Sequence, residues 1–165
     1  MRLSIRVLCA LCLALLLRCL ALAQDAAPAF SGTTFDGRSF DLARQRGRVV
    51  LVVLWRTDCV VCLNKMPELR ANALGWKDSP FDLVLLNVDP QRGDAARYDG
   101  LRRQLASAEG PVLSLWQGDA NVPTAWAAPA RWPLTWVIDR EGRIAARHEG
   151  RIPPEVWNQV ADLLP

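Results

Sequence analysis

The fold of this chain is decided by residues 49–62, which read VVLVVLWRTDCVVC. The first seven of them, from Val49 to Trp55, form an uninterrupted apolar run rich in β-branched side chains. Such a run is typical of a strand buried on both faces, so we expect it to be central in a sheet. The stretch ends on two cysteines, Cys59 and Cys62, at the point where the strand ends and a helix begins.

The spacing of apolar side chains predicts that helix over residues 60–76. Cys59 would then lie at the helix N-terminus, where unpaired backbone N–H groups and the helix dipole stabilise a thiolate, the reactive form of cysteine. Cys62 would lie one turn deeper on the same face, close enough for a disulfide and better shielded from solvent. The pattern predicts that Cys59 attacks and Cys62 resolves.

The first 23 residues differ in composition from the rest. Every residue from Val7 to Leu17 is apolar or Cys, two arginines precede this run, and Ala21-Leu22-Ala23 matches a cleavage pattern. This arrangement predicts a secretory signal peptide over residues 1–23 and a single domain over 24–165. An uncleaved anchor is less favoured, because a span needs about 20 apolar residues. We therefore expect an exported, periplasmic protein.

Removing that segment changes both the charge and the cysteine content. The full chain carries a net charge of +3, and its first 23 residues hold three arginines and no acidic residue, so the remainder is neutral. A neutral domain is not expected to bind nucleic acid. Only Cys59 and Cys62 remain, as a redox-active disulfide, a structural clip or half of a metal site.

The rest of the chain alternates between strand and helix patterns, which indicates an α/β domain. Residues 94–108 are predicted to be a helix with its apolar side chains on one face (Ala95, Tyr98, Leu101, Leu105 and Ala108). The other predicted elements are a hairpin at 30–41, strands at 81–88, 112–116, 134–138 and 143–149, and a helix at 154–164.

Three segments together resemble the thioredoxin superfamily, and specifically its exported TlpA-like branch: residues 49–62, 66–69 (MPEL) and 131–144 (RWPLTWVIDREGRI). The resemblance implies a thioredoxin-like fold, with a central mixed β-sheet flanked by helices. It also implies an N-terminal hairpin and an extra strand-helix insertion before a cis-proline. That proline would be Pro133, facing the disulfide, with Trp132 lining the substrate groove.

The resemblance also implies an activity, that of a thiol:disulfide oxidoreductase. Its expected partners are protein thiols and disulfides of exported proteins, with a membrane thiol reductase as electron donor. A reducing role in cytochrome c maturation or in envelope disulfide homeostasis is expected. The protein is expected to be a monomer, with no cofactor and no metal.

Three positions depart from the family pattern. Asp58 replaces the usual Trp before the first cysteine and places a negative charge beside Cys59, which opposes thiolate formation. Val53 stands where thioredoxins carry a buried acid. Lys65 stands where TlpA-like reductases often carry an acid, and its ammonium would stabilise a thiolate if it stays close to the cysteines.

Alternative interpretations remain open for other residues. His148 could join Cys59 and Cys62 in a copper-binding redox chaperone, since imidazole is a common copper ligand. The pair of cysteines could also be a relic in a domain without enzymatic activity. Three tryptophans, Trp116, Trp126 and Trp132, could form an apolar docking surface, although core packing is the default expectation.

Overall fold

The computed structural model describes residues 25–105, 110–126 and 129–165. The predicted signal peptide at 1–23 lies outside the described residues. Within the described ranges, no helix is both long enough and apolar enough to cross a membrane.

A mixed β-sheet organises the described residues, with the strand order β2-β1-β5-β4-β3-β6-β7. Strands β3, β4 and β5 are parallel, and the remaining neighbours pair antiparallel. The expected hairpin is present as β1 and β2, and the helix and strand expected before Pro133 are present as α3 (Arg92–Leu105) and β5. The strands are β1 (Ser31–Thr34), β2 (Ser39–Asp41), β3 (Val49–Trp55), β4 (Phe81–Asn87), β5 (Val112–Asn121), β6 (Leu134–Ile138) and β7 (Ile144–Glu149).

Strand β3 lies inside the sheet, between β4 and β6, and all seven of its residues are buried. Because successive side chains point to opposite faces, the strand contributes to two separate hydrophobic cores. Val53 and Trp55 belong to the core on one face, and Val52 and Leu54 belong to the core on the other. The prediction of a strand buried on both faces is therefore confirmed.

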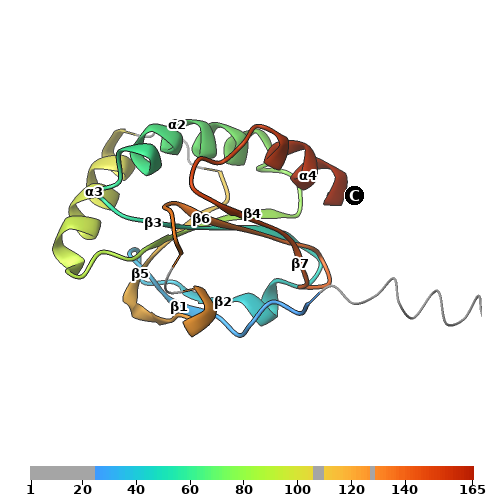
Figure 1. Ribbon diagram of the computed structural model, residues 1–165, viewed down its shortest axis with the longest axis horizontal. Helices are drawn as coiled ribbons and strands as arrows, with labels where there is room; N and C mark the ends of the chain where they lie inside the picture. The colour runs from blue at the N-terminus through green and yellow to red at the C-terminus, as the bar shows by residue number, and fades with distance from the viewer. Residues whose placement is uncertain (1–24, 106–109, 127–128) are drawn as a thin grey trace, which may run out of the picture.

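The three α-helices of the described residues lie on one face of the sheet (Figure 1). They are α2 (Val60–Gly75), α3 (Arg92–Leu105) and α4 (Glu155–Leu163). Helix α2 connects parallel strands β3 and β4, so its N-terminus stands at the carboxyl end of β3. The buried stripe of α2, at spacings of three and four residues, consists of Cys62, Met66, Leu69 and Ala73.

The hairpin and two 3-10 turns, η1 (Leu42–Gln45) and η2 (Thr124–Trp126), cover the opposite face. Trp126 is fully buried there, stacked on Trp136 with ring centroids 5.4 Å apart. It is a core residue, so it cannot contribute to the docking surface considered above.

Two sequence predictions were wrong in part. Strand β5 runs on to Asn121, well beyond the predicted end at residue 116, because its second half pairs with β1. On α3, Leu101 and Leu105 are 53% and 83% exposed, and Asp99 and Arg102 are buried in their place. These two charged side chains tolerate burial because they form an ion pair with each other, at 2.6 Å.

Candidate active site

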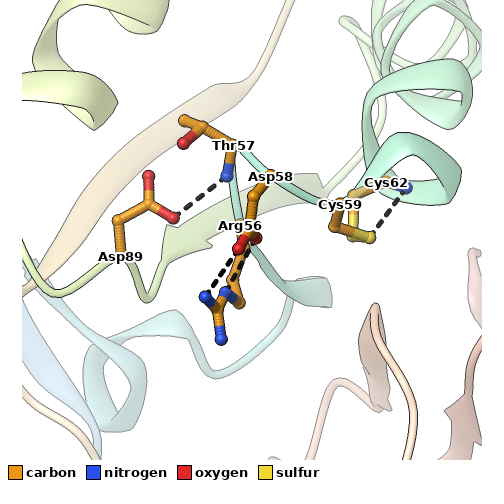
Figure 2. Close-up of a disulfide and its surroundings, with 6 residues drawn as sticks. All are labelled: Arg56, Thr57, Asp58, Cys59, Cys62 and Asp89. Atoms are coloured by element: carbon orange, nitrogen blue, oxygen red, sulfur yellow. Dashed lines mark hydrogen bonds and ion pairs between the residues drawn. A yellow bond between two sulfur atoms is a disulfide. The ribbon is translucent and has the colours of Figure 1, made fainter.

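The two cysteines form a disulfide at the junction of β3 and α2 (Figure 2). Cys59 is the N-cap residue of α2, with an extended backbone. Its Sγ accepts a hydrogen bond from the backbone N–H of Cys62 at 3.1 Å. A sulfur therefore occupies the cap position that a serine or aspartate oxygen usually fills, and it faces the positive end of the helix dipole.

The two sulfurs differ in their access to solvent. Cys62 is only 1% exposed and belongs to the core on the helical face, whereas Cys59 is half-buried and packs against the edge of that core. Val60 and Val61, between the cysteines, are both exposed. The predicted difference in shielding is confirmed, and a reaction partner reaches Cys59 more readily than Cys62.

Asp58 does not act on Cys59 as an isolated charge. Its carboxylate accepts two hydrogen bonds from the Arg56 guanidinium, at 2.9 and 2.7 Å (Figure 2). The bidentate pair places a compensating positive charge in the same loop. The opposition to thiolate formation expected from Asp58 is therefore weakened by a residue that sequence analysis did not single out.

A buried carboxylate holds the other side of this loop. Asp89 follows β4, is 4% exposed and accepts a hydrogen bond from the Thr57 backbone N–H at 3.0 Å (Figure 2). Its second oxygen accepts from Asn87 Nδ2 at 3.1 Å. Its backbone carbonyl accepts from Trp116 Nε1 at 2.8 Å, so the indole N–H of that tryptophan is also engaged.

Sequence analysis missed Asp89 as a site residue, since it is only the residue that follows the predicted strand at 81–88. The available signal was its position: because β3 and β4 are neighbouring parallel strands, the residues that follow them meet at one edge of the sheet. Asp89 thus anchors the loop that leads from β3 to Cys59.

The Trp132–Pro133 peptide bond is cis, as the resemblance implied. Pro133 is buried at the start of β6, and its carbonyl accepts a hydrogen bond from the Gly150 N–H at 2.8 Å. Trp132 is half-buried and packs against both cores, and Cys59 packs against one of them. A role of Trp132 and Pro133 in substrate binding stays a prediction.

Lys65 lies on α2 with its ammonium on Glu68, at 2.7 Å. Glu68 also accepts a hydrogen bond from Trp157 Nε1 of α4, at 2.6 Å. Burial alone would raise the pKa of Glu68, but the bonds from Lys65 and Trp157 outweigh it and hold that pKa below its ordinary value. The positive charge at position 65 is therefore shared with a neighbouring carboxylate, and its influence on Cys59 stays a prediction.

The copper alternative fails on geometry. His148 lies on β7, and its Nε2 is 3.1 Å from Oε1 of Gln159, on α4. Among the residues that the structure describes, no three His, Cys, Asp or Glu side chains form a group that could hold a metal ion. Cys59, Cys62 and His148 are therefore not brought together.

Val53, which stands where thioredoxins carry a buried acid, is itself buried and apolar. Its antiparallel neighbour on β6 is Thr135, a residue that sequence analysis did not select.

Comparison with known proteins gives a consistent result. The Redoxin family model matches residues 22–163. The chain is 30% identical over 155 residues to the thiol:disulfide interchange protein DsbE of Yersinia pestis, covering 88% of this chain and 72% of that protein.

Solved structures agree with the fold. A protein from Chlorobium tepidum described as a thiol:disulfide interchange protein DsbE superposes with a TM-score of 0.71 at 24% identity, covering 85% of this chain and 96% of the other. The thioredoxin domain of a thiol-disulfide oxidoreductase from Bacteroides vulgatus gives 0.67 at 21% identity, covering 86% and 97%. The expected thioredoxin-like fold is confirmed.

Proposed function

The chain belongs to the Redoxin family and is a thioredoxin-like thiol:disulfide oxidoreductase, and from this premise we propose that it is exported and exchanges its Cys59–Cys62 disulfide with protein thiols. In this proposal Cys59 is the nucleophile and Cys62 is the resolving cysteine. The substrates are thiols and disulfides of other exported proteins.

The observation that carries the proposal is the hydrogen bond from the Cys62 N–H to Cys59 Sγ at the start of α2. In the reduced protein, the same N–H and the helix dipole stabilise negative charge on Cys59. Cys62 is too deeply buried to meet a large substrate, but it lies within bonding distance of Cys59.

Reduction of a substrate then proceeds in two balanced exchanges. The Cys59 thiolate attacks the substrate disulfide, forming a mixed disulfide and expelling one substrate thiolate. Cys62 loses its proton and attacks Cys59 Sγ, which re-forms the Cys59–Cys62 disulfide and expels the second substrate sulfur. Two electrons pass to the substrate, and the departing thiolates take up two protons. Oxidation of a dithiol substrate is the same sequence in reverse.

The physiological assignment rests on the likeness to DsbE proteins and on the resemblance to TlpA-like reductases. We assign the protein to the periplasm, as a reductant in cytochrome c maturation or in envelope disulfide homeostasis. A membrane thiol reductase returns its electrons. Trp132 and Pro133 contact the extended substrate beside Cys59.

Two single-cysteine variants test the assigned roles. Cys62→Ser should accumulate mixed disulfides with envelope proteins, because the nucleophile remains and the resolving thiol is gone. Cys59→Ser is the matched control and should trap almost none. Both are read on non-reducing gels after rapid acid quenching. Equal trapping by the two variants would contradict the roles, and failure of the purified domain to reduce insulin would contradict the activity on proteins.

A further inference from the structure

Thr135 carries a buried hydroxyl that no other described residue satisfies. The residue is 0% exposed, and its Oγ1 has no hydrogen-bond partner in the described part of the chain. A buried hydroxyl without a partner costs free energy, so most are paired. In the disulfide form, the unpaired Thr135 hydroxyl therefore costs free energy.

The register of β6 places this hydroxyl on the face where the resolving cysteine is buried. Thr135 pairs with Val53 of β3, and side chains of paired residues point to the same face of a sheet. Val53 and Val137, the residue two positions beyond Thr135, both belong to the core that contains Cys62. The residues on either side, Leu134 and Trp136, belong to the opposite core.

The chemistry of Cys62 changes when the disulfide is reduced. In the disulfide its sulfur is bonded to Cys59 and carries no charge. In the reduced protein it becomes a thiol, and a thiolate at the moment it attacks the mixed disulfide. A buried thiolate needs a hydrogen-bond donor, because burial disfavours the charged form. The apolar Val53, at the position of the usual acid, supplies none.

We propose that the Thr135 hydroxyl donates a hydrogen bond to Cys62 Sγ in the reduced protein, where it stabilises the resolving thiolate. The threonine gains its partner only on reduction, which explains why it is unpaired in the disulfide form. It is a hydrogen-bond donor and keeps its proton; the proton of Cys62 passes to solvent and then to the departing substrate thiolate. This inference rests on the proposed role of Cys62 as the resolving cysteine.

Thr135→Val tests the proposal, because valine has nearly the same shape and lacks the hydroxyl. The equilibrium of the Cys59–Cys62 pair with glutathione should shift toward the disulfide by about two- to threefold, since the variant loses a hydrogen bond of the reduced form and a thiol sulfur is a weak acceptor. A purely structural threonine would change the stability of both redox forms equally and leave this equilibrium unchanged. Thr135→Ser, which keeps the hydroxyl, should behave as the wild type.

A kinetic experiment separates this inference from the proposed function. Reduced protein reacts with an aromatic disulfide such as Ellman's reagent, which releases one coloured thiolate when Cys59 attacks and a second when Cys62 resolves. Thr135→Val should slow the second release about tenfold and leave the first unchanged. Loss of the second release in wild-type protein would overturn the role of Cys62 itself.

Other outcomes overturn only the role of Thr135. His148 is the β7 neighbour of Thr135 in the sheet. If the Thr135 hydroxyl is paired with the His148 ring in both redox forms, Thr135→Val will leave the glutathione equilibrium and the second release unchanged. A Thr135→Ser variant that behaves like Thr135→Val would show that the methyl group, not the hydroxyl, matters.

Discussion

Removal of the Asp89 carboxylate tests whether one buried side chain holds the active-site loop. Asp89→Ala deletes the acceptor of the Thr57 N–H, at 3.0 Å, and of Asn87 Nδ2, at 3.1 Å. Asn87 is fully buried, so water does not readily replace the carboxylate there. The Thr57 N–H lies in a half-buried loop, where water compensates in part.

The expected loss of stability follows from these two bonds. A hydrogen bond to a charged acceptor contributes about 1.5–3 kcal/mol, and the lower end applies where water reaches the donor. Asp89→Ala should therefore lower the free energy of unfolding by about 3 kcal/mol, and Tm by about 10 °C for a domain of this size. Asp89→Asn keeps one acceptor oxygen and should lose about half as much.

Urea unfolding of the oxidised protein, followed by tryptophan fluorescence, measures this loss. The matched control is Asp119→Ala, which removes a carboxylate held by Arg92 at 2.8 Å on the surface. That variant should lose at most about 1 kcal/mol. If Asp89→Ala were no more damaging than Asp119→Ala, the conclusion that Asp89 anchors the loop would be wrong.

Three further predictions concern the helices. Because the pKa of Glu68 is held below its ordinary value of 4.5, its contribution to stability is present above that value and is lost as the pH falls through the lower folded value. Glu68→Gln should thus be less stable than wild type by at most about 1 kcal/mol at pH 7, and this difference should shrink as the pH falls below 4.5, measured by urea unfolding across that range. Lys65→Glu should raise the Cys59 pKa and lower the reduction potential, measured by thiolate absorbance against pH and by glutathione equilibration; unchanged values would show that Lys65 serves only its ion pair. Leu101→Ser should change the free energy of unfolding by less than about 0.5 kcal/mol, since this side chain is 53% exposed, and a loss above about 2 kcal/mol in urea unfolding would show that it is buried as the sequence pattern suggested.

The sequence predictions agree closely with the structure for features that depend on short stretches of sequence. The apolar run of β3 predicted its burial on both faces, and the spacing in α2 predicted a helix that begins just after Cys59. The prediction of a hairpin at 30–41 succeeded because its turn needs a positive φ, which a glycine adopts readily, and Gly37 has a φ of 84°. Each of these features depends on residues that are close together in the sequence.

Where polar residues are buried, the same reasoning failed. On α3, hydropathy favoured Leu101 and Leu105 for the buried face, but Asp99 and Arg102 occupy it because they neutralise each other there. Hydropathy alone scores each residue separately, so it cannot represent a pair whose burial is favourable only jointly.

The sequence by itself determined that a buried strand leads into a helix capped by the first of two cysteines, because strand burial, helix start and cysteine spacing are local properties. Only the tertiary structure decided which distant groups serve that site. Asp89 reaches Thr57 because β3 and β4 are parallel neighbours, and Thr135 lies on the sheet face where Cys62 is buried because β6 pairs with β3 in one register. These contacts depend on the order and register of strands far apart in the chain, which are set by packing of the whole sheet rather than by any one segment.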